Sequence, residues 1–432
     1  MGRSLRTSPL PTLTWAQRHS RMWDSTIWLL PVLWIALAAL LGWRAPALGA
    51  AFMGASVAPL SSASAIATLT AIASGMIALT AIVFSLVFVA LQFGSASYSP
   101  RLLRVLASNN LLSTALGVFT GTFIYALVAV RAVDLAGTSG INAVAVWVAW
   151  GWLLASVVTL VLLIPKVQSL SLVRVLPLIG HLSEHAISWL YPSRFDEQKE
   201  SEPPPELHAR QVIRHEGAPG YLTAIDVRRL VGLAEAADGL VSLPHAVGDF
   251  VLRGAPVALV SGAELPASKV RRCLVIEPYR AVRFDPAYGI RLLVDIAIRA
   301  LSPAVNDPTT AAMVLDQLES LLCRLAWLDL DVGQARDVEG VTRLVFPTPT
   351  WEDLLRLSVL EIQQYGSDSV TVERRLGALL HSLEKAVPEP RRPAVRRLLD
   401  HREKLVRQSF ASLDTVREAE ADDRQGLGLD EH

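Results

Sequence analysis

The stretch His181-Leu-Ser-Glu184-His185 contains the residue types of a zinc site. On an α-helix, two histidines four positions apart lie on one face, as two ligands of a single Zn²⁺ must. The stretch matches the H-x-x-E-H pattern of one class of zinc proteases. So short a pattern recurs by chance, however, and no downstream acidic helix stands out as the source of a third ligand. We therefore expect no bound metal and no cofactor, and His181, Glu184 and His185 remain the candidate ligands of an alternative, hydrolytic function.

A second group of polar side chains surrounds two predicted helix starts. Its members are Asp285, Arg291, Asp295, Arg299, Asn306 and Asp307. Asp285 precedes Pro286, and Asn306 or Asp307 precedes Pro308, in the usual order of an N-cap and a first helical residue.

The three charges at 291, 295 and 299 are four residues apart and share one helix face. Two arginines held by a carboxylate beside a helix N-terminus can bind an anion such as phosphate. The same spacing also makes an ion-pair ladder that only stabilises the fold, and we favour this structural interpretation. Asp295→Ala is then expected to destabilise the protein markedly. Glu319→Ala, which we assign to a solvated face, is not.

Other catalytic patterns are missing from the sequence. It has no phosphate-binding glycine loop, no G-x-S-x-G motif and no clustered carboxylates. The two cysteines, Cys273 and Cys323, lack metal-ligand spacing and are expected to be buried thiols. We therefore predict no catalytic residue and a protein that is not an enzyme.

Two motifs carry a resemblance to a known family. They are Asp285-Pro-Ala-Tyr-Gly-Ile-Arg-Leu-Leu-Val-Asp-Ile-Ala-Ile-Arg-Ala-Leu-Ser-Pro-Ala-Val-Asn-Asp-Pro-Thr-Thr-Ala311 and Gly248-Asp-Phe-Val-x-x-Gly-x-Pro-Val257. With a four-span N-terminus, they resemble the bacterial predicted membrane proteins of domain of unknown function 2254, from the first span to about residue 385. The family has a glutamine where this chain has Phe284, which leaves the role of that glutamine open here. The resemblance implies a membrane location and this architecture, and it implies no activity.

Composition separates the chain into an apolar and a charged half. Apolar residues make up 52% of the 432 residues and charged residues 19%, a combination unlike an average soluble protein or a wholly lipid-embedded one. No Asp, Glu, Lys or Arg occurs in residues 45–100, 105–130 or 135–165. The net charge is zero, which gives no indication of a nucleic-acid partner.

Four apolar stretches are long enough to cross about 30 Å of hydrocarbon. They are residues 25–43, 66–93, 111–130 and 142–164, which we group into a transmembrane domain over 25–165. Lys and Arg near their ends favour one side by eight to two. Arg3, Arg6, Arg18, Arg21, Arg101, Arg104, Lys166 and Arg174 oppose Arg44 and Arg131. By the positive-inside rule, both termini are cytoplasmic, in a multi-pass protein of the bacterial inner membrane.

Small and hydroxyl residues mark faces of the second and third spans. These residues are Ser74, Gly75, Thr80, Ser85, Gln92, Gly117 and Gly121. They could line a pore, or they could serve helix packing, in which small residues let helices approach closely in lipid. Packing is favoured, because the spans hold no ionisable residue of the kind that marks proton relays.

The charged half divides further. Residues 1–24 form a basic cytoplasmic tail. Residues 166–206 form a helix that continues the fourth span, bends at Pro177 and leads into a proline-rich linker. Residues 207–282 form a small β-rich subdomain, residues 283–420 a helical subdomain, and residues 421–432 a disordered tail. The fold class is thus an α-helical membrane protein with a cytoplasmic α+β domain.

The function that we favour is that of an inner-membrane protein without enzymatic activity. Its spans associate into a homo-oligomer in the lipid bilayer, and its cytoplasmic domain regulates, senses or acts as a scaffold. A channel-like role is the sharper form of this prediction, and a membrane-tethered zinc-dependent hydrolase is the alternative. The sequence does not identify an ion, a small-molecule ligand or a substrate.

Overall fold

A computed structural model of the chain describes residues 21–52, 61–97, 110–136, 139–168, 172–197, 203, 205 and 208–424. The chain forms two compact units that meet in sequence between Arg174 and Val175. We call them the apolar unit and the C-terminal unit. The predictions for the basic tail up to residue 20, for most of the proline-rich linker and for residues 425–432 lie outside the described residues.

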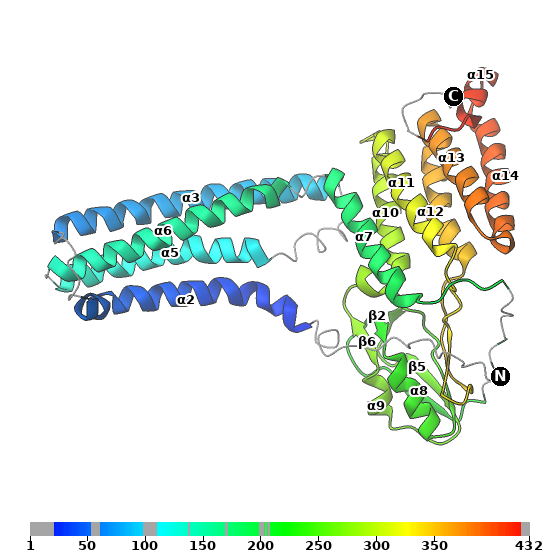
Figure 1. The fold of residues 1–432 in the computed structure, drawn as a ribbon, viewed down its shortest axis with the longest axis horizontal. Coiled ribbons are helices and arrows are strands. Elements are labelled where there is room, and N and C mark those ends of the chain that lie inside the picture. The colour runs from blue at the N-terminus through cyan, green and yellow to red at the C-terminus, as the bar shows by residue number, and fades with distance from the viewer. Residues whose placement is uncertain are drawn as a thin grey trace, which may run out of the picture. The chain divides into compact units, whose positions relative to one another are not determined.

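The described residues of the apolar unit form four long helices (Figure 1). They are α2 (Arg21–Phe52), α3 (Ser62–Ser97), α5 (Asn110–Ala136) and α6 (Ser139–Gln168), and each contains one predicted span. Among the residues that the structure describes, three stretches are long and apolar enough to cross a membrane, namely Ser62–Val89, Leu111–Asp134 and Ala143–Pro165. The apolar stretch found in α2, Leu29–Ala45, is shorter. Three of the four predicted spans thus meet the length criterion, and the first stays a prediction.

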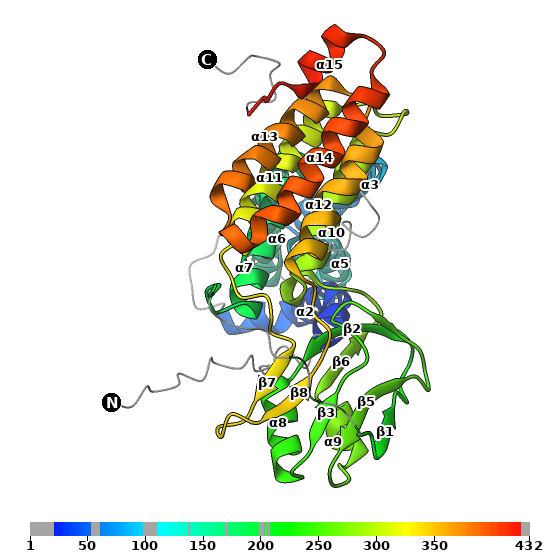
Figure 2. The ribbon, with the colours of Figure 1, turned by 90° about the vertical axis from the view of Figure 1, so that its right-hand side faces the viewer.

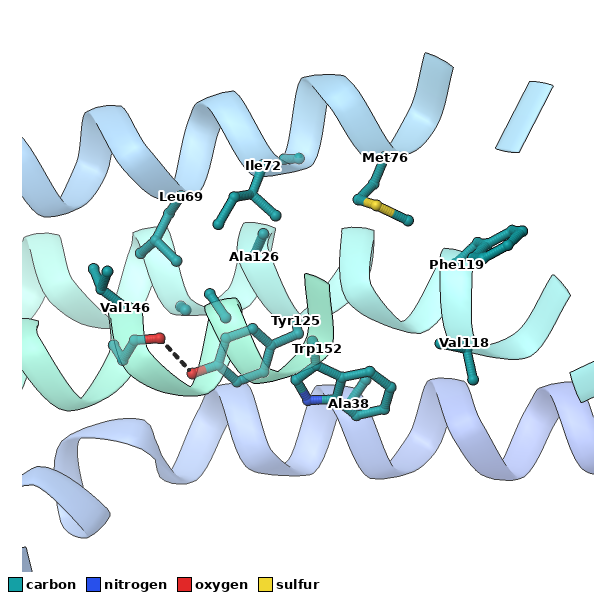
Figure 3. Packing of buried hydrophobic residues seen from close by; sticks show 14 of the residues in the cluster. Ala38, Leu69, Ile72, Met76, Val118, Phe119, Tyr125, Ala126, Val146 and Trp152 are labelled. Carbon is teal, nitrogen blue, oxygen red and sulfur yellow. Dashed lines mark hydrogen bonds between the residues drawn. The ribbon is translucent and has the colours of Figure 1, made fainter. Parts of the chain in front are cut away.

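Helix α5 packs against α2, α3 and α6. Figure 3 shows Leu69, Ile72 and Met76 of α3 among the side chains that fill the bundle. A Cβ added to Gly117 would lie 2.8 Å from the Cα of Pro31, and one added to Gly121 would lie 3.3 Å from the carbonyl oxygen of Trp34. These two glycines therefore let α2 and α5 approach closely, which agrees with the packing interpretation of that face.

Helix α7 (Leu172–Leu190) opens the C-terminal unit. The predicted continuation of the fourth span to residue 191 as one helix passes through residues 169–171, which lie outside the described residues, so it stays a prediction. Pro177 lies inside α7, and Val175, Ile179 and Ile187 are buried on one side of it.

Two small sheets form the β-rich part. The first has strand order β1-β5-β3-β8-β7, in which β3 and β8 are parallel and the other pairs antiparallel; the second has order β4-β2-β6 and is antiparallel. Helix α8 (Val227–Ala236) packs against β3, β7 and β8, and α9 (Ala267–Arg271) packs against β1. The strands are β1 (Gln211–Arg214), β2 (Gly220–Ile225), β3 (Leu240–Ser242), β4 (Phe250–Val251), β5 (Pro256–Ser261), β6 (Leu274–Glu277), β7 (Gln334–Arg336) and β8 (Thr342–Val345).

Strands β7 and β8 come from within residues 283–420, which the sequence analysis assigned to a helical subdomain. Val241 and Ser242 of β3 pair with Leu344 and Val345 of β8, so the chain returns to the first sheet after two helices. The helical assignment was wrong for these two strands. They have only three and four residues and carry arginines, so they lack the alternating apolar run that identifies a strand in a sequence.

The remaining helices lie side by side in the C-terminal unit, at the end of that unit away from its sheets (Figure 2). They are α10 (Pro286–Ala300), α11 (Pro308–Leu325), α12 (Trp351–Gly366), α13 (Val370–Ala386), α14 (Arg392–Ser409) and α15 (Leu413–Glu420). The start of the tail predicted to be disordered is packed. Asp422 accepts a hydrogen bond of 2.9 Å from His381, and Asp423 is buried with its N–H 3.4 Å from the carbonyl oxygen of Arg374.

Candidate functional site

The N-terminus of α10 is the place where the two signature motifs meet. Asp285 caps the helix, since its Oδ1 accepts a hydrogen bond of 3.0 Å from the N–H of Tyr288, as the sequence predicted. Its Oδ2 accepts two bonds from Arg280, at 3.1 Å from Nε and 2.6 Å from Nη2. The guanidinium of Arg280 also lies 5.0 Å from the centre of the Tyr288 ring. Asp285 is therefore the centre of this arrangement.

Glycines allow the surrounding segments to close on this pair. Gly248 has a φ of +97°, and a Cβ there would lie 2.7 Å from Cζ of Arg280 and 2.9 Å from Oδ2 of Asp285. Gly289 is covered by Ser183 of α7, whose Oγ would clash with an added Cβ. The Gly248 segment, α7 and α10 are thus joined around one buried carboxylate.

Burial decides the electrostatics here. It raises the pKa of Asp285 despite the opposing effect of Arg280 and of the backbone N–H groups that bind the carboxylate. Tyr191 is also buried, and its pKa is raised by burial and by the nearby charge of Asp285. Such a carboxylate is well placed to hold the three segments together. Removing Arg280 would leave it buried without its charged partner, which would destabilise these contacts.

Phe284 directly precedes the capping Asp285. Its ring lies 5.3 Å from that of Trp189 of α7, and the guanidinium of Arg283 lies 5.5 Å from it. In this chain the position joins α7 to the start of α10 through aromatic contact.

The six residues predicted around α10 and the following turn are not brought into one site. Helix α10 has 15 residues and therefore spans about 22 Å, so Asp285 and Arg299 lie at opposite ends of it. The six residues therefore do not bind one anion together.

The predicted ladder is observed in part. Arg291 donates to Asp295 over 2.7 Å and also binds Glu361 of α12. Hydrogen bonding by Glu361, the first cause, and the charges of Asp295 and Glu361 raise the pKa of Arg291. Arg299 lies on the same helix, and its carbonyl oxygen accepts a bond of 2.7 Å from Ser302. The Arg291–Asp295 pair thus extends to a neighbouring helix.

Either Asn306 or Asp307 was predicted to cap α11, and the structure of the turn between α10 and α11 decides between them. Asp307 caps α11, because its Oδ1 accepts a bond of 3.0 Å from the N–H of Thr310. Asn306 has a φ of +48°, a left-handed conformation in which asparagine is favoured. Asp307 is therefore the N-cap, and Asn306 makes the turn before it.

The zinc-like residues lie on the exposed side of α7. The Nε2 atoms of His181 and His185 are 3.2 Å apart, and their rings are perpendicular. Glu184 lies 4.0 Å from Arg324 of α11. Within the ranges that the structure describes, no group of three or more His, Cys, Asp or Glu side chains is suited to a metal ion.

The residues of the predicted polar face on α3 point outward from the bundle. Ser74, Gly75, Ser85 and Gln92 are exposed, and nothing lies within 4 Å of a Cβ built on Gly75. The Thr80 hydroxyl donates to the carbonyl oxygen of Met76 over 2.7 Å. Unlike Gly117 and Gly121, Gly75 therefore makes no close helix contact within one copy.

A buried charge pair joins α13 to α14, and no sequence pattern predicted it. Glu373 of α13 is fully buried, and its carboxylate lies 3.3 Å from Nε of Arg402, whose side chain is 2% exposed. A Cβ on Gly377 would lie 2.6 Å from Cζ of Arg402, so this glycine makes room for the guanidinium. Gly377, four residues after Glu373 on the same helix, was the available signal.

The assignment of Glu319 to a solvated face was also wrong. Its carboxylate accepts a bond of 2.5 Å from Arg375 of α13, and its side chain is only 22% exposed. Periodicity alone gave no indication of this partner, because Arg375 lies 56 residues further along the chain.

An apolar helical bundle joined to a unit with two small sheets and several packed helices defines a class of membrane protein. Residues 24–382 match the family described as predicted membrane protein (DUF2254), and the chain belongs to this family. It is 30% identical over 341 residues to uncharacterized protein Rv1290c of Mycobacterium tuberculosis (strain ATCC 25618 / H37Rv) and to uncharacterized protein Mb1321c of Mycobacterium bovis. Each alignment covers 75% of this chain and 64% of the relative. No solved structure matches the chain.

Proposed function

We propose that this chain is a multi-pass protein of the bacterial inner membrane without enzymatic activity, in which the C-terminal unit is a cytoplasmic regulatory, sensory or scaffolding domain. The observation that carries the proposal is the contrast between the surfaces of the two units. The apolar unit exposes large apolar side chains along α3, among them Ile77, Ile82 and Phe84. The polar contacts around Asp285 connect helices and loops without forming a recognisable catalytic group.

The orientation rests on the eight-to-two distribution of basic residues. Single cysteines at Ser61, which precedes α3, and at exposed Ser268 of α9 test it in intact cells. A membrane-impermeant thiol reagent should label Ser61→Cys and leave Ser268→Cys unlabelled until the cells are opened. The parent chain, which retains Cys273 and Cys323, is the background control. Labelling of Ser268→Cys in intact cells would contradict the proposed orientation.

The proposal includes a homo-oligomer, and the packing of α3 supports it. The interior of the bundle is filled by side chains such as Leu69, Met76, Phe119 and Tyr125, which leaves the outward hydroxyl-bearing face of α3 for other contacts (Figure 3). A channel-like pathway would therefore lie between copies of the chain, with Ser74, Gly75 and Ser85 facing it. Small residues on this face would let α3 helices approach one another in lipid.

Two matched glycines test the oligomer. Gly75 of α3 and Gly151 of α6 are both exposed, and both have nothing within 4 Å of an added Cβ, so leucine fits either position in one copy. Gly75→Leu should reduce the oligomer mass measured by light scattering in detergent, and Gly151→Leu should not. Equal masses for the parent chain and Gly75→Leu would exclude α3 as the contact.

A further inference from the structure

We propose that His181 and His185 bind one divalent transition-metal ion of the zinc, copper or nickel class through their Nε2 atoms. The proposal goes beyond the function proposed above and depends neither on the orientation of the chain nor on hydrolysis. It replaces the expectation of no bound metal, because the structure gives the distance between the two Nε2 atoms, which the sequence alone does not.

The separation of the two nitrogens fits a shared ion. A zinc–imidazole bond is about 2.0–2.1 Å long, so two nitrogens on one ion at angles of about 90–109° lie roughly 2.8–3.4 Å apart. The observed Nε2–Nε2 distance is 3.2 Å. An N–H···N hydrogen bond between neutral rings fits the same distance, and metal titration separates the two interpretations.

The helix holds the pair in place and leaves it accessible. The side of α7 that carries Ile179, Ser183 and Ile187 is buried, and Ser183 is packed on Gly289, so the helix has a fixed orientation within the C-terminal unit. His181 and His185 lie on the exposed side. An ion there would take two protein ligands, and water would complete its coordination.

Glu184 does not act with the histidines in this arrangement. Its carboxylate lies 4.0 Å from Arg324, which also donates to the hydroxyl of Ser188 over 2.7 Å. The proposal is therefore a two-imidazole site, and it differs from the hydrolase alternative, which requires Glu184.

Bound metal would connect two successive turns of α7. Pro177 lies one turn earlier and has no backbone N–H, so the helix lacks one of its hydrogen bonds at that point. An ion held by residues 181 and 185 would strengthen the part of α7 that follows the proline.

The experiment uses the full chain in detergent, freed of metal with a chelator and titrated with zinc chloride in a calorimeter. The parent chain should bind one ion with saturation. Loss of an outer-shell partner already weakens metal binding about 10–100-fold, so His181→Ala and His185→Ala should each weaken it at least about tenfold. His401→Ala, on the exposed side of α14, is the matched control and should leave affinity unchanged. No saturable binding, or equal binding by His181→Ala and the parent chain, would overturn the proposal.

Copper(II) provides a second test, which counts the coordinating nitrogens and does not depend on affinity. Electron paramagnetic resonance of the copper-loaded chain should show hyperfine coupling to two imidazole nitrogens, and each single histidine variant should show one. Glu184→Gln should bind zinc like the parent chain. Loss of binding in Glu184→Gln would exclude the two-imidazole site and favour a site that includes the carboxylate.

Discussion

Helices α3 and α13 place apolar and charged side chains in opposite ways. On α3, the exposed positions are apolar, and Ile82 is 66% exposed. On α13, three consecutive charged residues, Glu373, Arg374 and Arg375, are all buried. A helix whose exposed surface is hydrocarbon is typical of a lipid environment, whereas a helix that buries charges must supply each with a partner.

The difference follows from what surrounds each helix. Helix α13 packs against α11, α12, α14 and α15, so its polar residues face other helices. Arg375 donates to Asp316 over 2.7 Å and to Glu319, and Glu373 lies beside Arg402. Helix α3 packs against α5 and α6 and leaves a wide outward face. The environment of a helix, more than its composition, therefore determines which side chains it exposes.

The largest effect is expected from breaking the buried ion pair between Glu373 of α13 and Arg402 of α14. At pH 8, where the Glu373 carboxylate of the parent chain is ionised, Arg402→Ala would leave Glu373 as a buried charge without its partner, which typically costs about 3–5 kcal/mol. Arg402 also donates to the carbonyl oxygens of Glu373 and Ala419, at 3.0 and 2.6 Å, so α15 should loosen as well. Thermal unfolding of the purified chain measures the loss.

The control for Arg402→Ala is a second arginine of α14. Arg397 of α14 is 58% exposed and pairs with Glu352 at 2.8 Å, and such a surface pair contributes about 1 kcal/mol or less. If Arg402→Ala were no more destabilising than Arg397→Ala, the buried pair would not stabilise the unit.

A charge placed on α3 tests the other side of the comparison. Ile77→Arg should reduce membrane insertion and yield, because an arginine at the centre of a spanning helix costs about 2.5–3.5 kcal/mol. Leu413→Arg, at a position 77% exposed in α15, should change stability by no more than about 0.5 kcal/mol. A normal yield of Ile77→Arg in the membrane fraction would indicate that this face does not contact lipid.

The pH dependence of stability should come partly from Glu373. Burial raises the pKa of Glu373 to about 7 and outweighs the opposing effect of Arg402. Because the folded pKa lies above the unfolded value of 4.5, the stabilising contribution is present below about pH 4.5 and is lost as pH rises through about 7. Between pH 5 and pH 8, the parent chain should lose about 2–3 kcal/mol more than Glu373→Gln. Parallel pH profiles of melting temperature for the two chains would contradict this assignment.

The smallest effect is expected at the ladder on α10. Asp295→Ala removes one charge-assisted bond, of a kind that contributes about 1.5–3 kcal/mol, but Arg291 keeps Glu361, so we expect a loss of about 1–2 kcal/mol. Asp400→Ala, at an exposed position of α14, replaces Glu319→Ala as the control. An Asp295→Ala chain that folds normally but loses an anion-dependent stabilisation would restore the binding-site interpretation.

Local signals explain what the sequence could predict. Asp285, and one of Asn306 and Asp307, were predicted as caps, because an N-cap residue and the following proline act within one helical turn. The apolar stretches could likewise be predicted, since length and composition alone define a candidate membrane span. The division of the six-residue group could also have been predicted, because the length of α10 follows from its number of residues.

Partners distant in sequence explain what was missed. The role of Arg280 depends on a glycine turn more than 30 residues earlier. The pairing of β3 with β8 joins segments about 100 residues apart, and burial of Glu373 depends on helices that follow it. A charged Glu-Arg-Arg run indicates a solvated face unless the position of its helix within the unit is known.

The central claim is that the outward arc of α3 that carries Ile77, Phe84 and Phe88 contacts lipid, while the exposed face of the C-terminal unit contacts water. Nitroxide labels at Ile77, Phe84 and Phe88, and at Val338, Tyr365 and Leu413 for comparison, test it in vesicles, in a chain with Cys323→Ser. Collision with oxygen, which concentrates in hydrocarbon, should dominate at the α3 positions, and collision with a water-soluble nickel chelate should dominate at the other three. Nickel accessibility at the α3 positions as high as at Leu413 would contradict the account.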